Sequence, residues 1–243
     1  MENKEILQNL EKMIQETFSD PKKIRSFLLT LSKMYDMSYS NVLILKSQKD
    51  NVSRIISKEE VENNNYIIKD GEQPLNKIAR VKDENGKYKY ITKEVYDVSQ
   101  LEIELPKVNK TEQNYVEKIL KEMCKLRKIE YLGDNQIENI SNIVNDISSN
   151  CRDDSASKYN LDLYIEQIKA ENIATTFVIA KKLNVSTKNY SLKQVCDWGL
   201  DKDIKTLKES LKYIQKVTNY FIASYETQEK RNMIENMQED EME

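Results

Sequence analysis

The sequence contains no histidine among its 243 residues, and this absence excludes several kinds of chemistry. Without imidazole the chain has no neutral nitrogen ligand for zinc and no side chain that titrates near pH 7 unperturbed. It also lacks the base of a Ser-His or Cys-His nucleophile pair. We therefore expect function to rest on binding, with no cofactor and no catalytic residue.

Glycine and proline are scarce, with four and three residues, and 33% of the chain is charged. This composition is typical of helix-rich soluble proteins, and a chain of this length can bury a sizeable core. Cys124, Cys151 and Cys196 are widely separated and form no C-x-x-C pair, so we expect buried reduced thiols. No apolar run resembles a signal peptide or a membrane span, which favours a cytoplasmic protein.

Acidic residues gather at the C-terminal end of the chain. Residues 226–243 hold seven acids and two bases, a balance of −5, so the remainder sums to about +2 within the total of −3. We expect this segment to be an acidic tail, either a frayed helix or disordered, whose simplest role is to keep the protein soluble.

The first half of the chain combines helices with a hairpin. Apolar spacing across residues 6–14 predicts a first helix, Asp20-Pro21 starts a second, and Ser38 caps a third. A strand is expected at 52–56 and a helical turn at 58–61. Residues 77–93 read as a hairpin centred on Asn85-Gly86, with Tyr88 and Tyr90 on one face of its second strand. A further strand or turn follows at 96–100.

The second half reads as helical. Pro106 interrupts the strand pattern, and residues 106–110 therefore look like a linker. The predicted helices are 111–128, 134–150, 158–183, 191–198 and 203–225. We expect an α+β fold with an N-terminal domain at 1–105, in which helices pack on a small antiparallel sheet, and a helical domain at 111–225.

Three segments together resemble the ArdC/LtrC-like antirestriction protein family. Residues 27–48 are similar to the family's helix pair. Residues 68–72 are similar to its Lys-x-Gly-Glu turn, which is followed by a hairpin and by residues 96–100. Residues 190–214 are similar to its Tyr-Ser-x-x-Tyr-Ile-x-x-Trp segment and final helix. Each motif is short, and their order over most of the chain carries the resemblance. It implies a single-stranded-DNA-binding domain followed by a zinc-metallopeptidase-like domain with H-E-x-x-H on one helix.

The chain departs from this family at both histidine ligands of the zinc site. Apolar spacing places Asn145 and Ser149 where the family has its two histidines, and Asp146 at the base. By the resemblance, the family's third acidic ligand corresponds best to Glu171. A lone carboxylate cannot hold catalytic zinc, which keeps three protein ligands, so we expect a pseudo-metallopeptidase. Hard cations such as Mg²⁺ remain an alternative for the acids of this region, and solvated surface acids are the simpler interpretation. These acids are Asp146, Asp153, Asp154, Asp162 and Glu171.

Nucleic-acid binding needs cations for phosphates and exposed aromatic rings for bases. The candidate residues are Tyr35, Tyr39, Asn41, Lys46, Arg54, Lys77, Arg80, Lys87, Tyr88, Lys89 and Tyr90. Each of these residues has an alternative interpretation. The tyrosines are alternatively explained as packing in the core or on a sheet face, and the lysines as solvated charges at the sheet edge. Trp198 is expected to be a packing anchor rather than a stacking residue.

Two functions therefore stay open. The first is a non-catalytic anti-defence protein of a mobile element or phage that binds single-stranded DNA. The second is an inhibitor that binds a host defence nuclease complex directly, in the manner of an anti-CRISPR protein, with its acidic tail imitating DNA charge.

Overall fold

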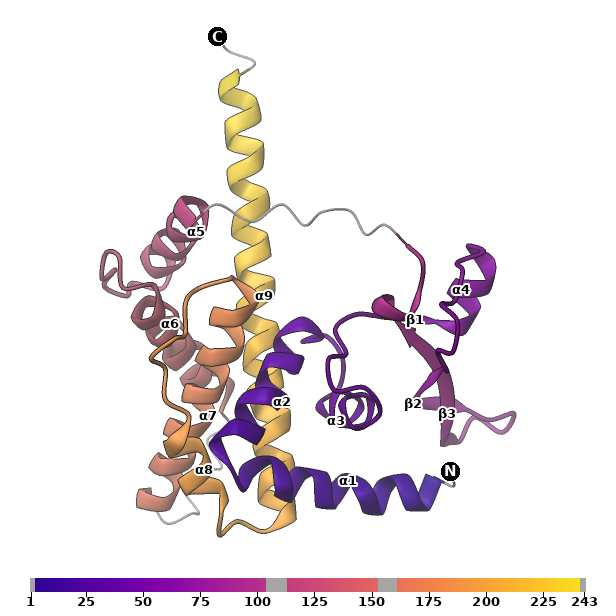
Figure 1. The fold of residues 1–243 in the computed structure, drawn as a ribbon. Helices are drawn as coiled ribbons and strands as arrows, with labels where there is room; N and C mark the ends of the chain where they lie inside the picture. Colours follow the sequence, from indigo (N-terminus) through magenta and orange to yellow (C-terminus); the bar gives the residue numbers. More distant parts are fainter. Residues whose placement is uncertain (1–2, 104–112, 153–160, 241–243) are drawn as a thin grey trace.

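The computed structural model describes residues 3–103, 113–152 and 161–240 and confirms the α+β class. N-terminal helices and a three-stranded antiparallel sheet precede a mostly helical region. In Figure 1 the sheet lies on one side of the molecule, the later helices lie on the other, and the long helix α9 (Ile204–Asp240) runs between them. None of the described helices is long and apolar enough to cross a membrane.

The second and third helices begin where the capping residues predict. Helix α1 covers Asn3–Phe18, α2 covers Pro21–Lys33 and α3 covers Tyr39–Gln48. The Asp20 carboxylate accepts a hydrogen bond from the Lys22 N–H, and the Ser38 hydroxyl accepts one from the Asn41 N–H. Both bonds satisfy N–H groups that a helix leaves without an internal partner.

The sheet has the order β1-β3-β2, with β1 at Ile55–Ser57, β2 at Leu75–Lys82 and β3 at Tyr88–Asp97. The predicted hairpin is confirmed, and its turn is closed by a bond from the Gly86 N–H to the Asp83 carbonyl, with Gly86 at φ +75°. This is a type I turn followed by a left-handed glycine, which suits a three-residue loop. A short helix, α4 at Lys58–Asn63, and a 3-10 helix at Val98–Gln100 complete this part.

The predicted strand at 52–56 is wrong in position, since β1 starts at Ile55. The reason is Asp97, whose buried carboxylate accepts the backbone N–H groups of Ser53 and Arg54 before the strand begins. Burial alone would raise the pKa of Asp97, but hydrogen bonds from Ser99, Ser53 and Arg54 outweigh it and hold that pKa below its usual value.

Two amide side chains of α3 fasten the hairpin to the helices. Asn41 donates to the Ile78 carbonyl at 2.9 Å and accepts from the Ile78 N–H at 2.8 Å. Two helical turns later, Gln48 makes the same pair of bonds to Asn76. Because β2 is an edge strand of the sheet, these amides pair main-chain groups that would otherwise lack a strand partner.

The later helices lie close to the predicted ranges. They are α5 at Gln113–Leu126, α6 at Gln136–Cys151, α7 at Leu161–Lys182, α8 at Lys193–Gly199 and α9 at Ile204–Asp240. The end of the last helix is a correction, because it continues past residue 225 to Asp240. Gln228 donates to Glu122 of α5, so the first part of the acidic tail packs on the protein. The predicted linker at 106–110 lies outside the described residues.

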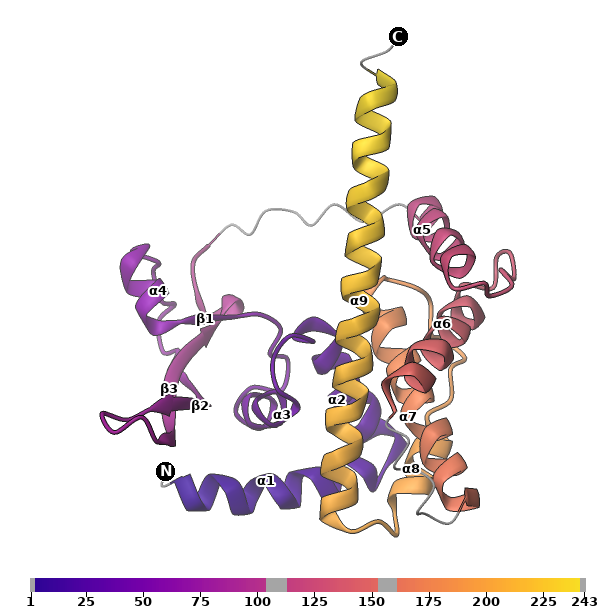
Figure 2. The same cartoon turned by 180° about the vertical axis from the view of Figure 1, so that it is seen from behind.

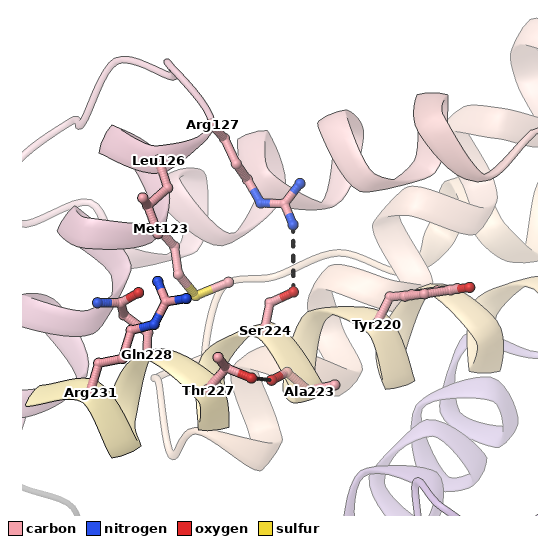
Figure 3. Close-up of a pocket in the computed structure, with 9 residues that line it drawn as sticks. All are labelled: Met123, Leu126, Arg127, Tyr220, Ala223, Ser224, Thr227, Gln228 and Arg231. Atoms are coloured by element: carbon pink, nitrogen blue, oxygen red, sulfur yellow. Dashed lines mark hydrogen bonds between the residues drawn. The ribbon is translucent and has the colours of Figure 1, made fainter. Parts of the chain in front are cut away.

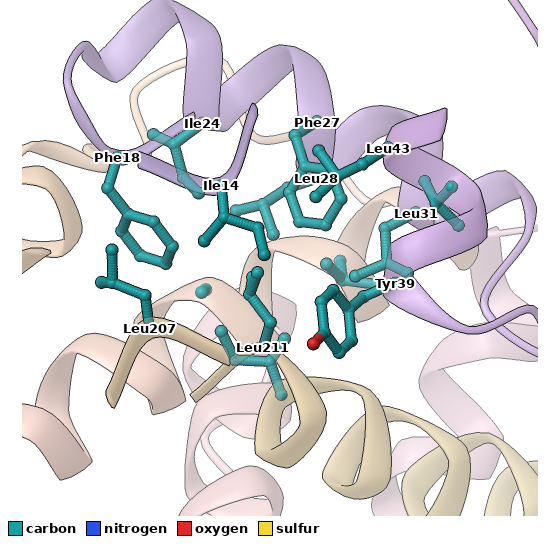
Figure 4. Close-up of a cluster of buried hydrophobic side chains, with 14 of the residues drawn as sticks. Ile14, Phe18, Ile24, Phe27, Leu28, Leu31, Tyr39, Leu43, Leu207 and Leu211 are labelled. Atoms are coloured by element: carbon teal, nitrogen blue, oxygen red, sulfur yellow. The ribbon is translucent and has the colours of Figure 1, made fainter. Parts of the chain in front are cut away.

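The main hydrophobic cluster joins both halves of the chain. Ile14, Phe18 and Phe27 from the N-terminal helices pack against Leu207 and Leu211 of α9 (Figure 4). The predicted packing role of Trp198 is confirmed, since its buried ring forms a T-shaped pair with Phe18, with the ring centroids 6.1 Å apart. Cys124 and Cys196 are buried free thiols as predicted, whereas Cys151 is only partly buried. A second cluster lies among α5, α6, α7 and α9.

Candidate nucleic-acid interface

One face of the hairpin alternates aromatic and cationic side chains. Tyr88 and Tyr90 are 55% and 56% exposed, and cross-strand register pairs them with Lys82 and Arg80. The Arg80 guanidinium lies 3.7 Å from the centre of the Tyr88 ring, which is a cation–π contact. The alternative interpretation, in which these tyrosines pack a buried sheet face, is wrong because the face is open to solvent.

A groove of about 720 Å³ runs beside this face. It is enclosed by β2, the first turn of α3 and α9, and Tyr90 reaches it from β3. Figures 1 and 2 both place α3 between α9 and the sheet. The groove brings together five of the predicted residues, Tyr39, Asn41, Lys77, Arg80 and Tyr90.

The α9 wall of the groove contains two residues that sequence reasoning missed. Lys212 adds a cation, and Gln215 fixes the α2–α3 connection by donating to the Tyr35 and Met37 carbonyls and accepting from the Tyr39 N–H. Both alternate with the core residues Leu211 and Ile214 and therefore look in the sequence like an ordinary solvated helix face. This face of α9 becomes a wall of the groove only because α3 packs beside it.

Three of the predicted residues in and near the groove have structural roles. The Tyr39 ring is 6% exposed and belongs to the core, so it offers no stacking face. Asn41 is occupied by β2 as described above. Tyr35 lies under the Lys182 ammonium at 4.6 Å and donates to Glu226, and its pKa is raised by burial and by that carboxylate.

The remaining predicted cations do not line the groove. Lys46 is paired with Asp50 at 2.6 Å, and Arg54 is exposed beside β1. Lys87 lies in the hairpin turn, where its N–H donates to Asp83. Lys89 is on the sheet face opposite Tyr88, because successive residues of a strand point to opposite faces. These four therefore flank the groove rather than line it.

The predicted third zinc ligand, Glu171, is buried in a cluster of hydrogen-bonded side chains. Its carboxylate accepts from Arg152 at 2.5 Å, from Gln167 at 2.8 Å and from Ser210 at 2.6 Å. The Arg152 guanidinium also covers the Tyr213 ring at 4.2 Å. Burial alone would lower the pKa of Arg152, but the charge and hydrogen bond of Glu171 outweigh it and raise that pKa. An arginine thus supplies the positive charge that balances this carboxylate.

The other three residues of the expected former zinc site have partners of their own. Asn145 accepts from Asn172 at 2.7 Å, Asp146 forms an ion pair with Arg127 at 2.6 Å, and the Ser149 hydroxyl donates to the Asp146 carbonyl. The residues present therefore do not fit zinc. Across the described residues no three His, Cys, Asp or Glu side chains come close enough to hold a metal ion. Asp153 and Asp154 lie outside the described residues, and nothing is described of the Asp162 side chain.

A comparison with solved structures finds a similarity to an antirestriction protein. The chain is similar to the metal-free crystal structure of the antirestriction protein ArdC from plasmid R388, with a TM-score of 0.43 and 10% identity. The match covers 77% of this chain and 85% of that one. No family model and no curated protein sequence matches the chain. The likeness concerns the course of the chain and does not assign a function.

The electrostatics of the groove favour an anionic ligand. Lys77, Arg80 and Lys212 line it with a single carboxylate, Asp36, among the described lining residues. The N-terminal end of α3, which carries the partial positive charge of the helix, also opens into it.

Proposed function

We propose that this protein binds single-stranded DNA at the hairpin face and the adjoining groove. The observation that carries the proposal is the pair of exposed rings, Tyr88 and Tyr90, set among Arg80 and Lys82 on one face. Bases stack on such rings with about 1–3 kcal/mol each, and cations follow the phosphates without reading sequence. We propose a single strand as the ligand because its bases are unpaired and can therefore stack on the tyrosine rings.

The biological role proposed is that of an anti-defence protein of a mobile element or phage. It rests on the three sequence segments that resemble the ArdC/LtrC-like family. The helical region would then be a metallopeptidase-like scaffold without catalysis. The Arg152–Glu171 pair supports this, because the carboxylate proposed as the remaining zinc ligand already has a cation.

Binding of a labelled single strand by the full chain, measured at two salt concentrations, tests the proposal. We expect Tyr88→Ala with Tyr90→Ala to weaken binding at least about tenfold, and the paired Phe variants to retain it, because stacking needs only the ring. Arg80→Gln should reduce the salt slope by about 0.7, the value for one lost phosphate contact.

Lys193→Gln is the control, since Lys193 is an exposed cation of α8 that lies outside the hairpin and the groove. It should leave the affinity nearly unchanged. A wild-type protein that binds no single strand at low salt would contradict the proposal. If such a protein instead co-purified with a host nuclease, the protein-binding inhibitor would be the better explanation.

A further inference from the structure

The groove beside the hairpin continues along α9. It shares Lys212 and Gln215 with a neighbouring hollow of about 530 Å³, which in turn shares Tyr220 and Ala223 with a third of about 500 Å³. In Figure 2 this helix lies in front of the others along its length. The three hollows therefore form one path from the hairpin toward the end of α5.

The continuation repeats the chemistry of the groove. Its cations are Lys212, Lys216, Arg127 and Arg231, and no carboxylate is among the described residues that line the two hollows on α9. Tyr220, 54% exposed, supplies a ring midway. Figure 3 shows Tyr220 and Arg231 at opposite ends of the third hollow, with Arg127 reaching over it from α5.

Existing contacts leave much of this charge available. Arg127 is paired with Asp146, and Lys216 donates to the Cys151 carbonyl, whereas Lys212 and Arg231 have exposed side chains. An apolar helix partner would meet these cations at a desolvation cost, while a phosphate chain would neutralise them. Charge therefore selects a polyanion as the occupant.

We propose that this α9 track is a second segment of the same binding site, occupied by the part of a single DNA strand that extends beyond the hairpin groove. The inference rests on the proposed function. From Lys212 to Arg231 the helix rises about 28 Å at ~1.5 Å per residue. With phosphates about 3.4 Å apart in a stacked strand, this length holds roughly eight nucleotides.

The test compares labelled oligo-dT of about 6 and about 20 nucleotides bound to the full chain. We expect the variant Lys216→Gln/Tyr220→Ala/Arg231→Gln to weaken binding of the longer strand at least about tenfold. Its salt slope should fall by about 1.4 for two lost phosphate contacts. Binding of the short strand should stay within about twofold of wild type, because the hairpin groove accommodates it.

Lys188→Gln/Lys193→Gln is the control, because it removes two exposed cations that lie outside the track. It should bind both strands like wild type, and circular dichroism should show the same helix content for both variants. Unchanged binding of the longer strand by the track variant would overturn the inference while the proposed function stands. Equal weakening at both lengths would also overturn it, since α9 would then belong to the primary site.

Two further outcomes would also contradict the proposed function or the choice of single-stranded DNA as the ligand. Wild-type protein that binds neither strand would contradict the proposed function and the track together. Tighter binding of duplex DNA or RNA through the same three residues would overturn the assignment to single-stranded DNA.

Discussion

At the scale of single residues, Arg152 and Glu171 form a buried ion pair at the position predicted for the third ligand of a former zinc site. The side chains are 13% and 2% exposed, and each compensates the charge of the other. Such a pair adds little net stability, yet removing one partner leaves an uncompensated buried charge. The sequence predicts the importance of Glu171 but not its partner, because Arg152 lies 19 positions away on another element.

We expect Glu171→Gln to lower the free energy of unfolding by about 3–5 kcal/mol, because the Arg152 guanidinium would stay buried without its counter-charge. Glu171→Leu combined with Arg152→Met should recover most of that loss, since it removes both charges at similar volume. Urea unfolding measures both. A Glu171→Gln variant as stable as wild type would show that water reaches the Arg152 guanidinium.

At the scale of elements, local signals predict where helices and turns begin. Asp20 and Ser38 cap their helices as expected, and Asn85-Gly86 forms the hairpin turn. The signals fail where a distant partner decides the outcome. Helix α9 passes residue 225 because α5 packs beside it, and the edge of β2 is completed by α3 amides that look like ordinary polar residues. The groove arises from such long-range contacts, so its α9 wall could not be predicted.

The amide clamp on β2 gives the prediction for this scale. Asn41→Ala removes the two hydrogen bonds to Ile78 and leaves its main-chain groups facing a helix, so we expect a loss of about 1–2 kcal/mol. Amide hydrogen exchange at Ile78 should accelerate, because the edge strand would open locally. Asn219→Ala on the exposed face of α9 is the control and should change neither quantity. Unaltered exchange at Ile78 in the Asn41 variant would mean that the clamp does not hold the strand.

At the scale of the whole molecule, α7 and α9 belong to both large hydrophobic clusters. Helix α9 contributes Leu207 and Leu211 to the cluster shared with α1–α3, and Val217 and Phe221 to the cluster shared with α5 and α6. Helices α1 and α8 are also closely packed, since a Cβ on Gly199 of α8 would come within 2.5 Å of the Phe18 ring of α1. The predicted division into domains at 106–110 stays a prediction, and unfolding tests it.

Trp198 is the only tryptophan of the chain, and its contact with Phe18 makes its fluorescence a probe of the junction between α1 and α8. Far-UV circular dichroism reports all helices, including α5 and α6. Because α9 runs through both clusters, we expect the two probes to give coincident transitions in urea. Leu211→Ala should lower the free energy of unfolding that both probes report by about 2–5 kcal/mol, the cost of a cavity in a packed core. A fluorescence transition that moved alone would mean that the two clusters unfold independently, and that α9 links two domains without making them cooperative.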